Sequence, residues 1–369
     1  MFIERVDIIR VKNPFQHPFE TSFTKFMERD ALLVKIYSEG HVGYGECKAF
    51  YGPFYCPEDN GTTHHIIKNF LIPTILHQEI EGPEQFIEKT RFIRGNNLAI
   101  AAVENALWDL KTKVENKSLK TLIGGVFNEV KVGVSLGIEP NLKDLLNKID
   151  HYLAEGYHRT KIKIKPGKDI EVLKGVRKAF PDIVLTVDAN AAYTLDDIEL
   201  FKAFDEFDLT YIEQPLREND IIDHSVLQKA IGTPICLDES IKSPEDAKQA
   251  IELGSCKIIN IKSSRCRGIS ESIKIHDLCV EREIPVWCGG MTELGIGRVQ
   301  NISLASLPNF KLAHDIAGSN RYFKEDIVIP EVKVTKDCTL IVPDETNGVK
   351  YEVDEDAIDK MMVSRDIFK

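Results

Sequence analysis

The amino-acid sequence predicts an α/β protein in which a (β/α)8-type barrel carries a separate α+β capping domain. The chain has 369 residues, which is more than one hydrophobic core usually organises, so two domains are expected. From Lys131 onward, short β-rich runs alternate with longer amphipathic segments, which is typical of a parallel barrel. The preceding residues instead show strand-like runs followed by helical spacing, as in an α+β domain.

The first third of the chain is expected to form the capping domain. Apolar or alternating runs predict three strand regions: 2–11, 31–37 and 40–45. Residues 17–23 are expected to form an aromatic and polar loop between the first two strands, and 50–55 a second loop. The spacing of Ala102, Ala106 and Leu110 then predicts a helix over 98–114.

The middle of the chain is expected to form the barrel. Eight β-rich runs predict its strands: 132–137, 160–164, 183–187, 209–212, 234–237, 257–261, 285–287 and 311–314. Helix starts support this, since Ser243 offers an N-cap and Pro244 suits the first helical position. After about residue 320 the alternation stops, and strand-like segments at 327–334 and 339–342 remain. We expect a capping domain at 1–128, a barrel at 129–320 and a segment at 321–369 that returns to the capping domain.

Composition narrows the function. The net charge of −11 argues against a nucleic-acid or anionic-membrane partner, because no basic excess is available to neutralise phosphates. Neither a signal peptide nor an apolar run long enough to span a bilayer is evident, and the eight scattered cysteines lack a CxxC pair. A cytoplasmic enzyme with reduced thiols is expected, with a small-molecule substrate and a homo-oligomeric state.

Ionisable residues follow five consecutive predicted strands, at the end where barrel enzymes place their chemistry. Lys161 and Lys163 alternate with isoleucines, so both are expected to face the barrel mouth. The acids Asp188, Glu213 and Asp238 follow at intervals of 25 residues, and Lys262 comes 24 residues later. Any one of these residues is better explained as a salt bridge or a helix cap. The set in register predicts a functional site, because ending every strand in an unpaired charge has no folding benefit.

The three acids are expected to bind a divalent metal ion. Clustered carboxylates repel one another unless a cation compensates, and all-oxygen ligation suits Mg²⁺, with Mn²⁺ as a substitute. Metal charge and partial burial are expected to lower the pKa of the flanking lysines, so that a neutral lysine can act as a base. Arg265, three residues after Lys262, is expected to favour neutral Lys262 further.

The sequence resembles the muconate-lactonizing subgroup of the enolase superfamily, and within it the o-succinylbenzoate synthase/N-succinylamino acid (N-acylamino acid) racemase family. The strand-end residues carry the resemblance, as do five further runs: HPFETSF (17–23), GYGEC (43–47), ALWDL (106–110), PVWCGGM (285–291) and LASLPNF (304–310). The resemblance implies Mg²⁺ on Asp188, Glu213 and Asp238. It also implies that Lys163 and Lys262 are acid and base on opposite faces of the substrate, as is general for this superfamily.

Further residues are assigned by the same resemblance. Auxiliary roles are expected for Lys161, Asn190, Glu239 and Arg265, and substrate contacts for Ser135, Phe23, Tyr55, Gly290, Met291 and Thr292. For Ser135, plain packing at the strand end is an equal alternative. The glycines after the seventh strand are expected to let a substrate carboxylate or succinyl arm approach the backbone, and the aromatic loops to close over the barrel mouth.

The implied reaction is removal of a proton α to a carboxylate through an enediolate. The first expectation is o-succinylbenzoate synthase, the dehydration step of menaquinone biosynthesis, which also racemises N-succinylamino acids in the same site. A dedicated N-acylamino acid racemase is the alternative. Residues 314–317 (His-Asp-Ile-Ala) lack the Asp-x-Asp of dipeptide epimerases, which argues against that activity. A Schiff-base lyase and an inactive binding protein are less favoured, because three acids and both lysines are present.

Overall fold

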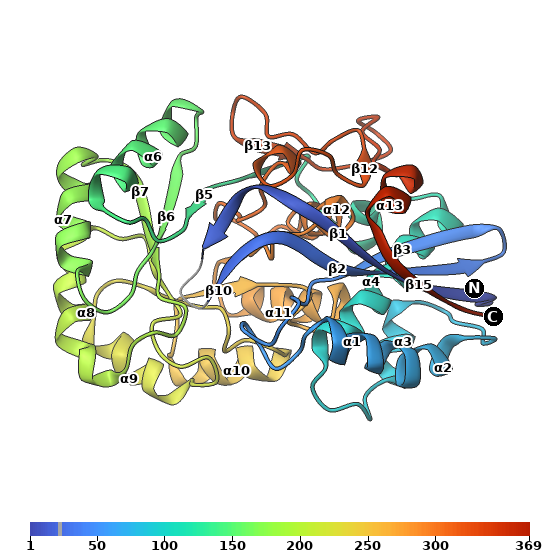
Figure 1. The fold of residues 1–369 in the computed structure, drawn as a ribbon. Coiled ribbons are helices and arrows are strands. Elements are labelled where there is room, and N and C mark those ends of the chain that lie inside the picture. The colour runs from blue at the N-terminus through green and yellow to red at the C-terminus, as the bar shows by residue number, and fades with distance from the viewer. Residues whose placement is uncertain (21–23) are drawn as a thin grey trace.

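The computed structural model describes residues 1–20 and 24–369, and it places an antiparallel sheet beside a parallel barrel (Figure 1). The sheet has the strand order β15-β1-β2-β3, with β1 at Arg5–Glu20, β2 at Lys25–Ser38, β3 at His41–Cys47 and β15 at Met362–Phe368. In Figure 1 the blue strands β1 and β2 reach from the end that carries both termini to the barrel strands. The first and last strands of the chain therefore pair with each other.

The first hairpin is longer than the sequence predicts. β1 continues to Glu20, so residues 17–20 are strand and not the expected loop. Its pairing with β2 shifts register between Pro14 and Phe19, a stretch that includes Pro18. Proline cannot donate a ladder hydrogen bond, and such irregularities bend a strand without ending it. Phe19 then pairs with Phe26, which brings two aromatic residues to the end of the hairpin.

The helix α4 packs closely on β3 because two glycines leave room for it. A Cβ atom on Gly43 would lie 2.2 Å from the carbonyl oxygen of Ala106, and one on Gly45 would lie 2.0 Å from that of Ala102. Only glycine permits this approach. The capping helices are α1 at Asn60–Ile66, α2 at Ile72–Ile75, α3 at Pro83–Lys89, α4 at Asn97–Glu115 and α5 at Leu119–Ile123. Apolar residues of the sheet and of α4 share one core.

Seven parallel strands form the barrel sheet in sequential order. They are β5 at Val134–Leu136, β6 at Arg159–Lys163, β7 at Val184–Asp188, β8 at Ile212–Glu213, β9 at Ile235–Leu237, β10 at Ile258–Ile261 and β11 at Val286–Cys288. The helices around them are α6 at Leu142–Ala154, α7 at Asp169–Ala179, α8 at Ile198–Phe204, α9 at Ile222–Ala230, α10 at Pro244–Leu253, α11 at Ile269–Glu281 and α12 at Gly295–Leu304. This alternation is the predicted barrel pattern.

The expected eighth strand, 311–314, is not a regular strand. Its segment makes isolated parallel bridges from Phe310 to Val286 and from His314 to Val132. The amide of Gly133 donates to the carbonyl of His314 (2.9 Å), and the amide of Asp315 donates to that of Cys288 (3.1 Å). A few hydrogen bonds to both neighbours therefore close the ring, too few to make a continuous ladder.

The C-terminal segment adds small elements before it returns to the capping sheet. These are β4 at Glu129–Lys131, which pairs with β13 at Thr339–Ile341, then β12 at Val328–Ile329, which pairs with β14 at Glu352–Val353, and α13 at Glu355–Met361. Lys35 of β2 donates to the carboxylate of Glu355 at 2.7 and 2.8 Å, which fixes the start of α13 on the sheet. The division at residues 128 and 320 stays a prediction.

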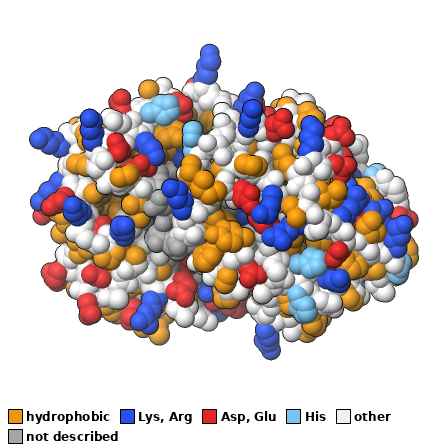
Figure 2. All heavy atoms as spheres, viewed as in Figure 1, with side chains coloured by type: hydrophobic (Ala, Val, Ile, Leu, Met, Phe, Trp, Pro, Cys, Tyr) orange, Lys and Arg blue, Asp and Glu red, His pale blue; other side chains and the backbone are white. Residues whose placement is uncertain are grey.

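The described surface mixes charges of both signs. On the face drawn in Figure 2, basic and acidic side chains are interspersed with apolar ones. None of the helices among the described residues combines the length and the apolar character that crossing a bilayer requires. All eight cysteines are free thiols, and seven of them are buried.

Candidate active site

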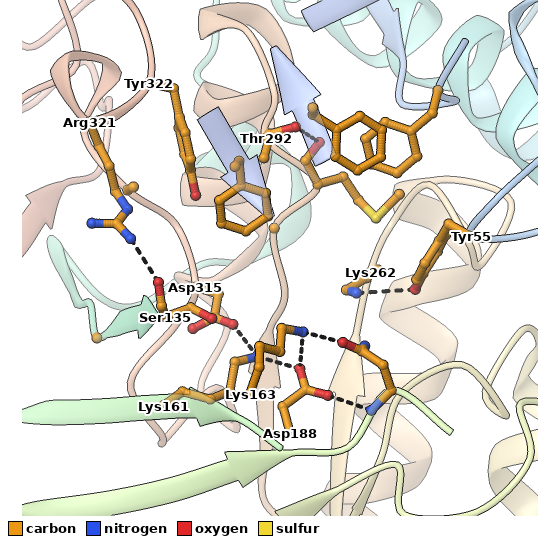
Figure 3. A pocket seen from close by; sticks show the side chains of 18 residues that line it. Tyr55, Ser135, Lys161, Lys163, Asp188, Lys262, Thr292, Asp315, Arg321 and Tyr322 are labelled. Carbon is orange, nitrogen blue, oxygen red and sulfur yellow. Dashed lines mark hydrogen bonds and ion pairs between the residues drawn. The ribbon is translucent and has the colours of Figure 1, made fainter. Parts of the chain in front are cut away.

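A pocket lies at the C-terminal ends of the barrel strands, where the capping hairpin reaches the barrel (Figure 3). Side chains from both parts line it: Phe19, Phe26, Phe50 and Tyr55 from the cap, and Ser135, Lys161, Lys163, Asp188, Asn190, Lys262, Gly290, Met291, Thr292, Asp315, Arg321 and Tyr322 from the barrel and the C-terminal segment. Ten of the residues predicted from sequence are in this set. Barrel enzymes carry their active sites at this end.

The two lysines of β6 point into the pocket, since alternate residues of a strand share a face. Lys163 Nζ donates to Asp188 Oδ2 at 2.6 Å and to Asn190 Oδ1 at 2.5 Å. Lys161 Nζ donates to Glu213 Oε2 at 2.7 Å and lies 3.3 Å from Asp188 Oδ2. Each lysine therefore contacts an acid on the next strand or the one after it.

The three predicted acids converge at neighbouring strand ends. Asp188 is in register with Glu213, and both are buried. Asp238 joins them through Asn260, whose Nδ2 donates to Glu213 Oε1 and to Asp238 Oδ1, each at 2.9 Å. Glu213 and Asp238 lie behind the residues that line the pocket, and only Asp188 of the three lines it.

Lys262 lies on the other side of this cluster, at the end of β10. Its Nζ donates to Asp238 Oδ2 at 2.8 Å and to the Tyr55 hydroxyl at 3.1 Å. Arg265 contacts the second oxygen of Asp238 and donates to Tyr55 at 3.1 Å. The loop of the cap that carries Tyr55 is thus held directly to the acid and the lysine of the barrel, and Figure 3 shows the contact between Tyr55 and Lys262.

Two further predicted residues link the acids. Asn190 donates from its backbone to Asp188 Oδ1 at 3.0 Å and from Nδ2 to Glu239 Oε1 at 3.0 Å. The second oxygen of Glu239 is buried and has no hydrogen-bond partner among the described residues. Asn190 and Thr292 also have positive φ angles of 43° and 55°.

The pKa values of the cluster show how crowded its charges are. Burial and the neighbouring Asp188 raise the pKa of Glu213 to about 8. Burial lowers the pKa of Lys262, and Arg265 lowers it too, but the charge of Asp238 raises it well above its ordinary value. Lys161 likewise has a raised pKa because Asp315 and Glu213 outweigh burial. Direct contact with carboxylates therefore raises the pKa of both side chains, and the expectation that a bound metal ion lowers these pKa values stays a prediction.

The donor set fits a hard divalent cation. Asp188, Glu213 and Asp238 offer only oxygen atoms, which Mg²⁺ prefers, and their shared partners Lys161 and Asn260 show that they converge. Glu239 adds a buried oxygen that lacks a partner within the described chain. As they stand, no three His, Cys, Asp or Glu side chains of residues 1–20 and 24–369 form a ready metal cage, because ammonium groups lie between the carboxylates.

Most of the predicted substrate-contact residues line the pocket, and their contact with a substrate stays a prediction. Phe23 lies outside the described residues, and the other five line the pocket. The glycines after β11 also have a packing reason, and the expected approach of a substrate to their backbone stays a prediction. A Cβ on Gly289 would lie 2.5 Å from Asn260 Oδ1, and one on Gly290 would lie 2.4 Å from the Asp315 carbonyl. Close packing of the barrel strands thus requires both glycines.

Sequence reasoning missed two charged residues of the pocket wall. Asp315 contacts Lys161 and accepts from Arg159 Nη2 at 2.6 Å. Its place directly after the expected eighth strand, 311–314, is a signal that the sequence does carry, beyond the missing Asp-x-Asp pattern. Arg321 lies beyond the barrel in the C-terminal segment, where no periodic pattern pointed to the site.

A buried charge network joins the cap to the pocket loop after β11. Glu46 of β3 accepts from Arg29 (3.2 Å) and from the backbone amides of Leu294 (3.2 Å) and Gly297 (3.2 Å) at the start of α12. Arg29 and Glu46 are each 1% exposed. Glu46 therefore holds the cap to the segment that follows Gly290, Met291 and Thr292.

Replacing Glu46 with glutamine is expected to lower the free energy of unfolding by about 3–5 kcal/mol, because Arg29 would remain buried without its counter-charge. Chemical denaturation monitored by circular dichroism measures this. Glu84→Gln is the control, since Glu84 is exposed and lies 3.9 Å from Lys111, a pair worth less than about 1 kcal/mol. Equal stabilities of the two variants would show that the network does not hold the domains together.

The chain is similar to known proteins over almost its whole length. Residues 4–124 match the mandelate racemase/muconate lactonizing enzyme N-terminal domain, and 144–357 match the enolase C-terminal domain-like family. The chain is 46% identical to an o-succinylbenzoate synthase from Geobacillus stearothermophilus over 359 residues, covering 97% of this chain and 95% of the relative. It is 42% identical to an N-succinylamino acid racemase from Thermus thermophilus, covering 93% of each.

Solved structures extend the comparison to the fold. A crystal structure of an enolase-superfamily protein from Listeria innocua superposes with a TM-score of 0.95 at 41% identity, covering 100% of this chain and 99% of the other. The two matched domains together span most of the chain. The protein therefore belongs to the mandelate racemase/muconate lactonizing enzyme family of the enolase superfamily.

Proposed function

We propose that the protein is an o-succinylbenzoate synthase that removes a proton α to a carboxylate and expels hydroxide, and that the same site racemises N-succinylamino acids. The observation that carries this proposal is the placement of Lys163 and Lys262 on well-separated strands of one pocket, each beside an acid of the cluster. The relatives that bear these two activity names cover more than nine tenths of the chain.

The two lysines would move the proton. A base must lie within hydrogen-bond reach of the α-carbon, and Lys163 and Lys262 line the pocket from β6 and β10. Asp188 and Asn190 orient the Lys163 ammonium group, while Asp238 and Tyr55 orient that of Lys262. Proton removal leaves two negative charges on the enediolate, and Lys161 at the pocket floor adds positive charge beside them.

Asp188, Glu213 and Asp238 would hold Mg²⁺, or Mn²⁺ in its place. The bound cation would supply positive charge next to the substrate carboxylate and stabilise the dianion. It would also compete with Lys161 and Lys262 for the same carboxylate oxygens, and the loss of those ion pairs would remove the main cause of their raised pKa values.

A dedicated N-acylamino acid racemase is the second candidate, because Arg265 contacts Asp238 beside Lys262 and a racemase needs a proton donor and acceptor on each face. A Schiff-base lyase has no chemical need for a cluster of three acids, and a binding protein has no need for two pocket lysines. We also propose a cytoplasmic location, in keeping with eight free thiols. A place in menaquinone synthesis and a homo-oligomeric state are further parts of the proposal.

Purified enzyme supplied with Mg²⁺ is expected to dehydrate the o-succinylbenzoate precursor, as followed by absorbance, and to racemise an N-succinylamino acid, as followed by polarimetry. Borohydride is not expected to trap an adduct with substrate. Dehydration without racemisation would leave the synthase alone, and racemisation without dehydration would favour the dedicated racemase. Failure of both reactions would reject the proposal.

Tyr55→Phe is expected to change the ratio of racemase to synthase activity several-fold while the Mg²⁺ concentration for half-maximal activity changes less. The hydroxyl of Tyr55 accepts hydrogen bonds from Lys262 and Arg265, so its loss should alter the lysine that racemisation requires. Tyr51→Phe is the control, because Tyr51 lies in the same loop and is 51% exposed. An unchanged ratio in Tyr55→Phe would return Tyr55 to a packing role.

A further inference from the structure

Arg321 is a cation on the pocket wall whose contacts are all with neutral groups. Its Nη1 donates to the Tyr152 hydroxyl at 2.5 Å, and its Nη2 donates to the backbone oxygen of Ser135 at 2.7 Å. The guanidinium also lies 4.9 Å from the ring centre of Tyr152 and 5.7 Å from that of Tyr322. Among the acidic side chains that the structure describes, none forms an ion pair with it.

The other cations that line the pocket are all committed to acids. Lys163 pairs with Asp188, Lys262 with Asp238, and Lys161 with Glu213 and Asp315. Asp315 also lines the pocket, but its charge is shared by Lys161 and Arg159. A partly buried guanidinium with no counter-ion is costly, and a bound anion offsets that cost.

Arg321 also lies where the far end of a substrate would be. Figure 3 shows it beside Ser135, across the pocket from Tyr55, with the lysines and Asp188 between them. A guanidinium carries five N–H donors, of which two form the hydrogen bonds to Tyr152 and Ser135 and a third interacts with the Tyr322 hydroxyl. Donors therefore remain for a carboxylate, which binds guanidinium groups in a planar, two-pronged geometry.

We propose that Arg321 binds the second carboxylate of a dicarboxylic substrate, the one that is remote from the reacting carbon. This inference rests on the proposed function, since a succinyl group ends in such a carboxylate. It makes Arg321 a specificity residue for the acyl arm, with Ser135 and Tyr152 holding the guanidinium in place. Substrates whose acyl arm ends in a neutral group would leave the cation unpaired.

The test compares an N-succinylamino acid with its N-succinamoyl analogue, in which an amide replaces the remote carboxylate. Wild-type enzyme with Mg²⁺ is expected to prefer the acid in kcat/KM by roughly 10- to 100-fold, the usual range for one charged hydrogen-bonded contact. Arg321→Gln is expected to lose this preference, mainly through KM. If circular dichroism shows that Arg321→Gln does not fold, Arg321→Met takes its place in the comparison.

Arg94→Gln is the matched control, because it makes the same change at an exposed arginine that does not line the pocket; it is expected to retain the preference. A wild type that uses acid and amide equally, or an Arg321→Gln variant with the wild-type preference, would overturn the inference.

A second measurement does not depend on turnover. N-succinylglycine should raise the Tm of wild type more than N-succinamoylglycine does, and Arg321→Gln should remove the difference. If neither reaction turns over but the two ligands still differ in their effect on Tm, the proposed reaction is rejected and the anion site is kept. If turnover and the difference in Tm are both absent, the proposed reaction and the anion site are both rejected.

Discussion

Replacing Lys163 with alanine is expected to lower both dehydration and racemisation by at least about 10²- to 10⁴-fold, the usual contribution of a positioned acid or base. Lys163 lines the pocket and contacts Asp188 and Asn190, and Asp188 keeps Lys161 as a counter-ion when Lys163 is removed, so the fold is expected to persist. Steady-state kinetics with both substrates, alongside thermal melting, measures the effect.

Lys165→Ala is the control for this variant, because Lys165 is exposed in the loop that follows the same strand. It is expected to keep wild-type kinetics. If Lys163→Ala folds and retains either activity at the wild-type rate, Lys163 is not the base for that reaction.

Replacing Glu213 with glutamine is expected to reduce activity on the order of 10³-fold, since charge stabilisation by a bound cation contributes several kcal/mol. The glutamine keeps the size of the side chain and a partner for Lys161, so the fold should persist. Excess EDTA should have the same effect on wild type, and added Mg²⁺ or Mn²⁺ should reverse it. Asp188→Ala and Asp238→Ala should also abolish turnover.

Glu199→Gln serves as the matched control for the metal prediction, because the Glu199 side chain is 78% exposed and pairs only with Lys202. It should neither lose activity nor change its response to Mg²⁺. Full activity of wild type in excess chelator would rule out a metal-dependent reaction.

The barrel and its site were predictable because they depend on local periodicity. Strand alternation placed Lys161 and Lys163 on one face, and the constant spacing of Asp188, Glu213 and Asp238 reflected one βα unit per step. Strand ends in a parallel barrel meet at one rim, so sequence order alone brought these groups together. The same reasoning gave the helix that became α4, with its small residues against β3.

The remaining features depend on contacts between segments that are distant in sequence. The pairing of Phe19 with Phe26 lengthens β1 beyond its apolar pattern, and the last barrel segment is held by bridges that carry no sequence signal. The pKa of Lys262 is raised because its ammonium group contacts the Asp238 carboxylate, and the spacing of these residues in the sequence does not determine that contact. Arg321 reaches the pocket only because the C-terminal segment folds back over the barrel.

The central claim is that Lys163 and Lys262 act on opposite faces of one α-carbon. Its most direct test is α-proton exchange in D₂O, followed by NMR, with each enantiomer of an N-succinylamino acid and the variants Lys163→Ala and Lys262→Ala. Lys257→Ala is the control, since Lys257 directly precedes β10 and is exposed. The claim predicts that each active-site variant exchanges the α-proton of only one enantiomer and does not racemise it. Lys163→Ala and Lys262→Ala should act on opposite enantiomers. Racemisation by Lys262→Ala at the wild-type rate would contradict it.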